Sequence, residues 1–273
     1  MLVTSGAQHA FALVLAALAG ARDRVLVEHP TYPNALDAIR ARGARPVPVP
    51  MGPGRRGTGS WDLDLLTASV RDAAPRLMYV IPDSHTPTGG VLDEAGRERL
   101  VALARRTGTP VVIDETLAEL PLDGPPPAPS ASFGGADSTH VLTVGSASKV
   151  FWGGLRVGWI RASPPLVRRL GAARAALDLG GPTLEQLITS RLLADVDTVV
   201  AQRKIELAAA RDHLLDRLGA VFPSWRASRP TGGLSLWIEL GAPVSSRLAI
   251  AARRHEVLLA AGPRFGVDGA FER

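Results

Sequence analysis

The sequence predicts an α/β protein: a three-layer α/β/α domain with a mainly parallel sheet, followed by a smaller α+β domain. Short apolar runs rich in β-branched residues alternate with longer helical stretches through most of the chain, which is the order expected of βαβ units. The helical stretches end at or near glycines, which readily adopt the left-handed conformation that closes a helix. The 273 residues, 46% of them hydrophobic, suffice for one large domain with a smaller one attached.

Six short runs bounded by turn residues are the strand candidates. They are residues 24–30, 45–51, 76–83, 109–115, 140–146 and 157–163. Helices are predicted at residues 7–20, 32–43 and 93–108. The segment 123–138 is rich in Pro, Gly and Ser, so we expect a surface excursion between two strands there.

The pattern changes after the sixth strand. A long helical stretch is predicted over residues 183–218, with a break near Asp195, and a strand is predicted over residues 232–240. This stretch is typical of a hinge helix that leads into a second domain. We therefore predict a large domain at residues 1–196 and a small carboxyl-terminal domain at residues 197–273.

Composition argues against several classes of function. The chain has no cysteine, which removes disulfides, thiolate metal sites and cysteine nucleophiles, and its six histidines lack metal-ligand spacing, so we expect no metal. The net charge is +5, but the arginines are scattered along the sequence, so we expect no nucleic-acid binding by this chain itself. The first apolar run lacks a charged start and is too short to span a membrane. We expect a cytoplasmic protein without membrane contact.

Lysine is scarce in this chain, which has only Lys149 and Lys204. A buried lysine can present a nucleophilic amine and form a Schiff base, which arginine cannot do. Ser146, Ser148 and Arg156 lie close to Lys149 in sequence and could hold a phosphate dianion by charge-assisted hydrogen bonds. A phosphate-bearing aldehyde would suit this arrangement.

Three other segments carry groups that complement such a lysine. Asp114 ends an apolar strand, where a carboxylate could pair with a pyridinium nitrogen. The motif TSGAQHA at residues 4–10 places a glycine turn at a helix start, whose free amides and dipole favour a phosphate. Tyr32 follows a strand on a turn, where its ring could stack on a flat ligand.

Together these motifs resemble the aminotransferase-type domain of fold-type I pyridoxal-phosphate proteins. They are most similar to the form fused to winged-helix regulators of the GntR/MocR family. The motifs TSGAQHA, EHPTYPN, SHTPTGG, VVIDE and GSASKVFWGGLRVGW follow the family's order. The seven-residue step from Lys149 to Arg156 is typical of the regulator-fused branch.

The resemblance implies that Lys149 carries pyridoxal 5'-phosphate as a Schiff base and moves the substrate proton, while Asp114 keeps the pyridine nitrogen protonated. It also implies a homodimer that acts on an amino acid and a 2-oxo acid. The other cofactor-binding residues that it implies are Gly6, Ala7, Gln8, Tyr32, Thr86, Ser146, Ser148 and Arg156.

Two positions depart from the family's pattern. Thr86 stands where many aminotransferases have asparagine, and Leu117 stands where a tyrosine usually lies, so two hydrogen bonds to the cofactor's phenolic oxygen would be missing. His85 could be a substitute donor or a loop histidine without a role at the site. The chain also begins near the first phosphate motif and ends before the family's substrate-clamping arginine, so we expect it to be short at both ends.

Two functions therefore stay open. The first is a pyridoxal-phosphate-dependent aminotransferase. The second is the ligand-sensing domain of a MocR/GntR-type transcription regulator without its winged helix, which binds the cofactor and an amino compound without useful turnover. Thr86, Leu117 and the lysine-to-arginine spacing favour the second function. A third reading is a truncated remnant that folds poorly.

Overall fold

The computed structural model describes residues 1–134 and 139–273. The strands are β1 Leu2–Thr4, β2 Arg24–His29, β3 Arg45–Pro50, β4 Gly52–Pro53, β5 Gly59–Ser60, β6 Leu77–Val80, β7 Val111–Asp114, β8 Val141–Ser146, β9 Gly158–Arg161, β10 Arg226–Ala227 and β11 Ile238–Glu239. The α-helices are α1 Ala7–Leu18, α2 Pro33–Ala41, α3 Leu63–Ala73, α4 Glu94–Thr107, α5 Pro164–Arg174, α6 Thr183–Leu193, α7 Val196–Val221 and α8 Ser245–Ala252.

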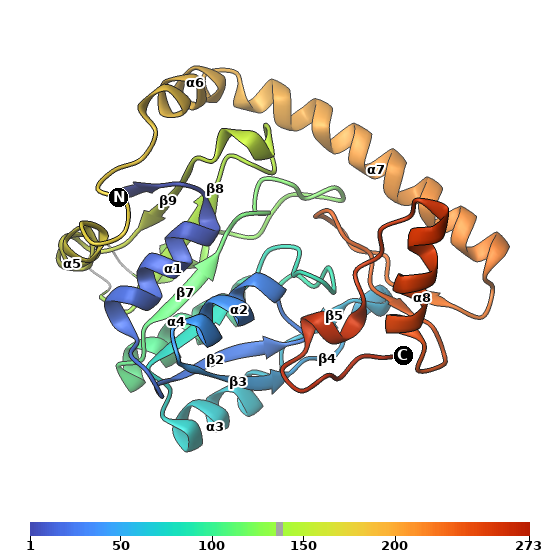
Figure 1. Cartoon of the computed structure of the whole chain (residues 1–273), viewed down its shortest axis with the longest axis horizontal. Coiled ribbons are helices and arrows are strands. Elements are labelled where there is room, and N and C mark those ends of the chain that lie inside the picture. Colours follow the sequence, from blue (N-terminus) through green and yellow to red (C-terminus); the bar gives the residue numbers. More distant parts are fainter. Residues whose placement is uncertain (135–138) are drawn as a thin grey trace.

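A seven-stranded sheet with the order β1-β9-β8-β7-β6-β2-β3 forms the centre of the molecule (Figure 1). Strands β3, β2, β6, β7 and β8 run parallel to one another, whereas β9 and β1 pair antiparallel at one edge. The α/β class, the mainly parallel sheet and all six predicted strands are confirmed. Strand β1 was not predicted, because three residues before a glycine turn give too short a pattern.

Helices cover both faces of this sheet and bury two separate apolar cores. One core packs α1, α2 and α5 against one face of the sheet, and the other packs α3 and α4 against the opposite face. Because both faces are covered, the middle strands are apolar on both sides. They therefore form continuous hydrophobic runs in the sequence. The three-layer arrangement is therefore confirmed.

The ends of the covering helices follow simple capping chemistry. Asp93 begins α4 by accepting a hydrogen bond from the Gly96 amide at 2.8 Å, and Gly108 ends this helix in the left-handed conformation, with φ 64°. The predicted helices at residues 7–20, 32–43 and 93–108 are confirmed as α1, α2 and α4. Helices α3 and α5 were not predicted, although Asp62 and Pro164 are ordinary helix-start residues.

The carboxyl-terminal third departs more from the predicted pattern. The break at Asp195 is confirmed, since it separates α6 from α7. The predicted strand at 232–240 is wrong for most of its length, because only β11 at its end pairs, with β10. The glycine pair that opens this segment packs instead on the turn after β7, where the Gly233 amide donates to the Leu120 carbonyl at 3.0 Å.

The proposed boundary between residues 196 and 197 coincides with the start of α7 and stays a prediction. Of the predicted excursion 123–138, the described part to residue 134 is irregular apart from one 3-10 turn, and residues 135–138 lie outside the described residues. None of the helices in the described ranges combines the length and hydropathy of a membrane span.

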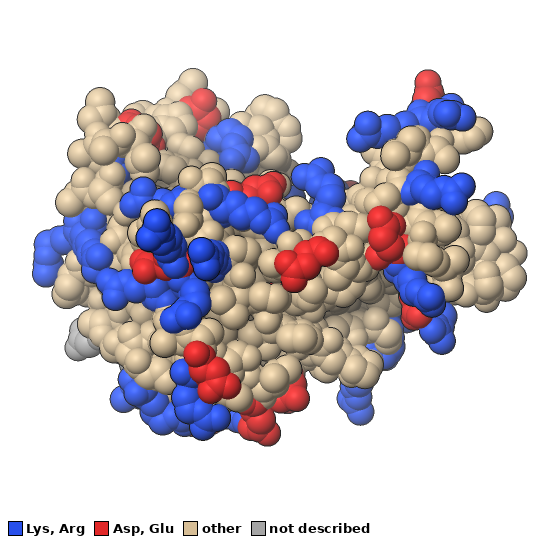
Figure 2. Space-filling view, turned by 60° about the horizontal axis from the view of Figure 1, so that its bottom comes forward, with Lys and Arg blue, Asp and Glu red and all other residues tan. Residues whose placement is uncertain are grey.

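Three arginines from distant parts of the sequence converge on the carboxyl end of α1. Arg42, Arg76 and Arg169 together donate hydrogen bonds to the last free carbonyls, at residues 16–19, over 2.7 to 3.2 Å. Figure 2 shows that Lys and Arg side chains gather on the left half of the face turned toward the viewer. Helix carboxyl ends carry partial negative charge, so these basic residues have a structural partner other than a carboxylate.

A buried ion pair lies beside the sheet at the start of the loop after β6. The Arg97 side chain, 1% exposed, donates to Asp83 Oδ1 at 2.7 Å and to the Leu92 carbonyl at 2.8 Å. The guanidinium also reaches the Pro82 carbonyl at 3.3 Å. Arg97 therefore ties α4 to the loop that carries the SHTPTGG motif.

Glu115 lies near this pair, directly after β7. Burial and then the charge of Asp83 raise the pKa of Glu115 to about 7, although a hydrogen bond with Thr143 and the charges of Arg161 and Arg97 lower it. Within the described residues its Oε1 atom has no hydrogen-bond partner. The folded chain therefore favours the protonated form of this carboxyl.

Replacing Arg97 with methionine is expected to lower the free energy of unfolding by about 3–5 kcal/mol, because Asp83 would be left buried without its partner. Denaturant unfolding measures the loss. Arg99→Met, on the same helix, is the matched control, since Arg99 is 55% exposed and pairs with Asp64 at the surface; it should cost less than about 1 kcal/mol. Equal losses would contradict the importance of the buried pair.

Replacing Glu115 with glutamine is expected to flatten the dependence of stability on pH. The wild-type pKa is about 7 in the folded chain against 4.5 for a free side chain. The folded state therefore holds the extra proton between these values, and stability falls as pH rises through this window. Near pH 5 the variant should match the wild type, and near pH 8 it should be more stable by roughly 1–3 kcal/mol.

Thermal unfolding at both pH values tests this expectation. Glu119→Gln, at an exposed position four residues further along the chain, is the matched control and should show the wild-type pH dependence. A Glu115 variant that kept the wild-type dependence would contradict the assignment of the titration to this carboxyl.

Candidate functional site

A cavity of about 460 Å³ opens where β6, β7 and β8 end and α1 begins. In open α/β sheets, ligands bind at this carboxyl edge. Nine of the ten predicted site residues line it: Ala7, Gln8, Tyr32, Thr86, Asp114, Ser146, Ser148, Lys149 and Arg156. Gly6, the tenth, directly precedes α1 and lies against Arg156. Apolar lining residues that the sequence did not single out include Phe11, Ile81 and Leu234.

Lys149 stands on the cavity wall in the turn that follows β8. The flanking Ala147 and Val150 are buried, and the Ala147 amide donates to the Val157 carbonyl at 3.0 Å, so the turn is anchored on both sides. The sequence analysis expected Lys149 to be buried, and this expectation is wrong, because the residue is exposed. Its backbone is fixed by the core, while its exposed side chain lines the cavity.

Asp114, the last residue of β7, is buried and held by two hydrogen bonds. Its Oδ2 atom accepts from the Tyr79 hydroxyl at 2.6 Å, and its Oδ1 atom accepts from the Thr116 amide at 2.9 Å. Burial raises the pKa of Asp114, and the two hydrogen bonds oppose this shift. The carboxylate is therefore fixed in direction, and a cation in the cavity would favour its charged form.

Sequence reasoning missed Tyr79. This residue lies inside an apolar strand run and is 1% exposed, and burial raises the pKa of its hydroxyl well above the ordinary value. A buried tyrosine hydroxyl requires a hydrogen-bond partner, so a tyrosine within a buried strand was the available signal. The sequence could not say that the partner would be Asp114.

The amino end of α1 borders the cavity. Gly6 adopts φ 89°, and a Cβ atom there would lie 2.6 Å from Arg156 Nη2, so the guanidinium packs where a side chain would stand. Arg156 itself has φ 51° and donates to the Ser5 carbonyl at 3.1 Å. The free amides of Ala7 and Gln8 belong to the same first turn, which makes this corner favourable for an anion.

Two serine hydroxyls border the same region. Ser146 Oγ accepts from the Ser148 amide at 3.2 Å and lies 3.4 Å from the Val157 carbonyl. The Ser148 hydroxyl is buried and has no hydrogen-bond partner within the described residues. A buried hydroxyl without a hydrogen-bond partner costs free energy, so a ligand that accepted a hydrogen bond from it would bind more favourably.

Tyr32 and the two departures from the family's pattern lie on other parts of the wall. Tyr32 is partly buried, and its hydroxyl accepts from Asn34 Nδ2 at 2.9 Å. Thr86 lines the cavity on the loop after β6, and Leu117 presents a buried aliphatic side chain after β7. The apolar Leu117 cannot supply a hydrogen bond.

His85 does not border the cavity. It is fully buried, with its Nε2 atom 3.2 Å from Glu28 Oε2 and its Nδ1 atom 2.9 Å from the Thr88 hydroxyl. Glu28 also accepts from Trp61 Nε1 at 2.6 Å. His85 therefore anchors its loop to β2, and this position does not support its reading as a substitute donor.

Comparison with known proteins identifies relatives of two kinds. The family described as aminotransferase class I and II matches residues 1–272. The 2-aminoadipate transaminase of Thermus thermophilus is 32% identical over 98% of this chain and 68% of its own length. The uncharacterized HTH-type transcriptional regulator YisV of Bacillus subtilis is 27% identical over 87% of this chain and 48% of its own length.

Solved structures agree with this assignment. The α-aminoadipate aminotransferase LysN from Thermus thermophilus, complexed with N-(5'-phosphopyridoxyl)-L-leucine, has a TM-score of 0.89 and 33% identity, covering 99% of this chain and 69% of that one. N-succinyldiaminopimelate aminotransferase from Mycobacterium tuberculosis has a TM-score of 0.84 and 28% identity, covering 93% and 65%. The chain thus spans about half to two thirds of its relatives. It belongs to aminotransferase class I and II and has the fold-type I architecture.

Proposed function

We propose that this chain is a pyridoxal-phosphate-dependent aminotransferase that moves an amino group between an amino acid and a 2-oxo acid. The observation that carries the proposal is the placement of Lys149 and Asp114 on the wall of one cavity, together with an anion-binding corner. Transaminases among the relatives support the same class of reaction. The substrates are small molecules, and we propose a homodimer, as the family resemblance implies.

The cavity residues fit this cofactor at both of its ends. A phosphate suits the corner formed by the Ser148 hydroxyl, which has no hydrogen-bond partner within the described residues, the Arg156 guanidinium and the first turn of α1. A protonated ring nitrogen suits Asp114, whose carboxylate is already fixed by Tyr79. Tyr32 supplies an aromatic face for the ring.

Asp114 acts as the electrostatic anchor of the proposed site. When bound, pyridoxal phosphate supplies an aldehyde that takes up amines reversibly and a ring that withdraws electrons from the substrate. The buried Asp114 carboxylate would hold a proton on the ring nitrogen by ion pairing. Tyr79 and Thr116 keep the carboxylate in place without competing for that proton, because both of them donate hydrogen bonds to it.

Lys149 would hold the cofactor through its Nζ atom and would move the α-proton of the substrate. The lysine is suited to both tasks because its backbone is anchored while its exposed side chain lines the cavity. The apolar side chains of Phe11, Ile81 and Leu117 limit the access of water to the reacting atoms. The class of reaction is therefore amino-group transfer, and Lys149 is its acid and base.

A second function is favoured by two residues of the same cavity. Thr86 and Leu117 stand where the family resemblance implies groups that hydrogen-bond to the cofactor, which favours binding of the cofactor without efficient turnover. Several relatives are transcriptional regulators, of which this chain spans about half. The alternative is therefore a MocR/GntR-type sensing domain that takes up pyridoxal phosphate and an amino compound.

Lys149→Ala is expected to abolish covalent attachment of pyridoxal phosphate, because the other lysine, Lys204, lies on α7 and does not line the cavity. Mass spectrometry after borohydride reduction measures the attachment. Lys204→Ala is the matched control and should keep one cofactor per chain. Specific attachment that survived in the Lys149 variant would sink the assignment.

A panel of amino acids added to the cofactor-loaded chain separates the two candidate functions. An aminotransferase should lose the yellow absorbance with a donor amino acid and recover it with a 2-oxo acid, because the amino group leaves and returns. A sensing domain should shift its spectrum with a ligand but form no 2-oxo acid. A chain that takes up no cofactor would contradict both proposals.

A further inference from the structure

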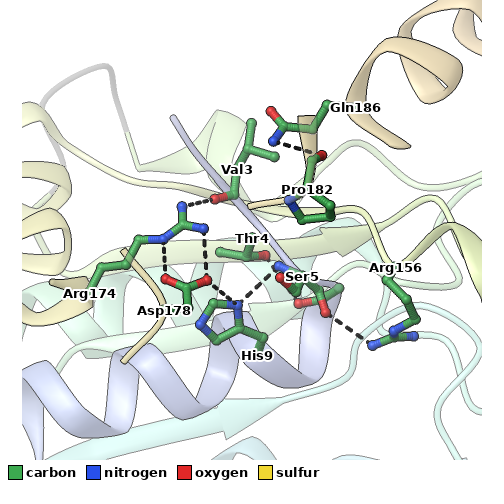
Figure 3. Close-up of polar contacts among 10 residues, drawn as sticks. Val3, Thr4, Ser5, His9, Arg156, Arg174, Asp178, Pro182 and Gln186 are labelled. Carbon is green, nitrogen blue, oxygen red and sulfur yellow. Dashed lines mark hydrogen bonds and ion pairs between the residues drawn. The ribbon is translucent and has the colours of Figure 1, made fainter. Parts of the chain in front are cut away.

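A series of polar contacts links β1 and the first turn of α1 to the end of α5 (Figure 3). Arg174, the last residue of α5, donates to both carboxylate oxygens of Asp178, at 2.6 and 2.9 Å. Its third donor reaches the Val3 carbonyl of β1 at 2.5 Å. The side chain of Arg174 is 10% exposed and that of Asp178 is 25% exposed, so this ion pair is partly shielded from water.

His9 lies between this ion pair and the start of α1. Its Nδ1 atom accepts a hydrogen bond from the Ser5 amide at 3.0 Å, and the same atom lies 3.7 Å from Asp178 Oδ2 (Figure 3). A ring nitrogen that accepts from an amide carries no proton, so this contact requires neutral His9 with its proton on Nε2. Partial burial lowers the pKa of His9, which favours that form; Asp178 opposes this shift and Arg174 adds to it.

Ser5 connects His9 to the anion-binding corner. Its amide is held by His9, and its carbonyl accepts from Arg156 Nη2 at 3.1 Å. The next residue is Gly6, against which the guanidinium packs. The backbone on which Arg156 rests is therefore fixed from its far side by the imidazole.

We propose that His9 is a positioning residue for the phosphate end of the cofactor site, acting through Ser5 on Arg156 and on the first turn of α1. This inference rests on the proposed function. The charged groups that face His9 are Asp178 and Arg174. Protonated His9 would donate from Nδ1, so it would release the Ser5 amide and turn toward Asp178.

The effect should be confined to one end of the ligand. Within the described residues, Asp114, Tyr32 and Lys149 lie on other elements and form no hydrogen bond or ion pair with His9 or Ser5. Pyridoxal, which lacks the phosphate, is therefore the internal reference. A general loss of stability would weaken the binding of both ligands, whereas displacement of Arg156 would weaken the binding of pyridoxal phosphate alone.

The experiment measures dissociation constants of pyridoxal phosphate and pyridoxal for the full chain from about pH 5 to about pH 8. His9→Ala removes the hydrogen-bond acceptor. It should raise the dissociation constant of pyridoxal phosphate roughly three- to tenfold at neutral pH and leave that of pyridoxal unchanged. His9→Gln keeps an uncharged acceptor and should bind near the wild-type level. His213→Gln, at an exposed histidine of α7, is the matched control.

The pH profile gives a second readout. The ligand phosphate itself titrates near pH 6, so the wild type is compared with His9→Gln at each pH, where that titration cancels. The wild type should lose affinity relative to the glutamine variant as pH falls below the ordinary histidine range. Thermal unfolding first establishes that each variant is folded, and the glutamine variant keeps the comparison available if the alanine variant is not.

The outcomes distinguish this inference from the proposed function. Wild-type chain that binds no pyridoxal phosphate would overturn both. Wild-type binding combined with unchanged affinity in His9→Ala, or with equal losses for the two ligands, would overturn the positioning role alone. The positioning role would also be overturned if the ratio of the pyridoxal phosphate dissociation constants of the wild type and His9→Gln stayed constant across the pH range.

Discussion

The parallel pairing of β6, β7 and β8 is the constraint on which the cavity depends. In-register neighbours such as Val80 and Ile113, and then Asp114 and Val144, bring the carboxyl ends of these strands to one edge. Residues separated widely in the sequence, including Tyr79 and Asp114, meet there for that reason. Both faces of the strands are covered by helices, so the edge is the open side of the sheet at this point.

Burial at that edge has a cost that hydrogen bonds offset. Asp114 is desolvated, and donors on two different elements stabilise its charged form. Glu115, the next residue, has lost water without gaining the same number of donors, and its pKa rises to about 7. Burial thus raises the pKa of both adjacent carboxyls, and the groups that oppose the shift differ because successive side chains point to opposite faces of a strand.

The sequence predicted most of what lies in regular, strongly patterned segments. Apolar strands, capped helices and the order of the motifs placed nine of ten site residues on one cavity. Prediction from the sequence failed where the position of a side chain depends on residues far away in the sequence. The exposure of Lys149, the contact of Tyr79 with Asp114 and the burial of His85 against Glu28 are tertiary facts with no local signal. The strand expected at 232–240 failed because its opening glycine pair, Gly232 and Gly233, packs on the turn after β7, and only Ile238 and Glu239 find a strand partner.

The arginine cap of α1 has a consequence for chemical selectivity. Arg42 alone reaches two carbonyls, through Nε and Nη2, which the single ammonium group of a lysine could not do in the same geometry. Guanidinium groups remain protonated and do not attack aldehydes at neutral pH. A chain that builds its helix caps and most of its positive surface from arginine therefore offers an aldehyde few side-chain amines with which to react, and Lys149 meets little internal competition.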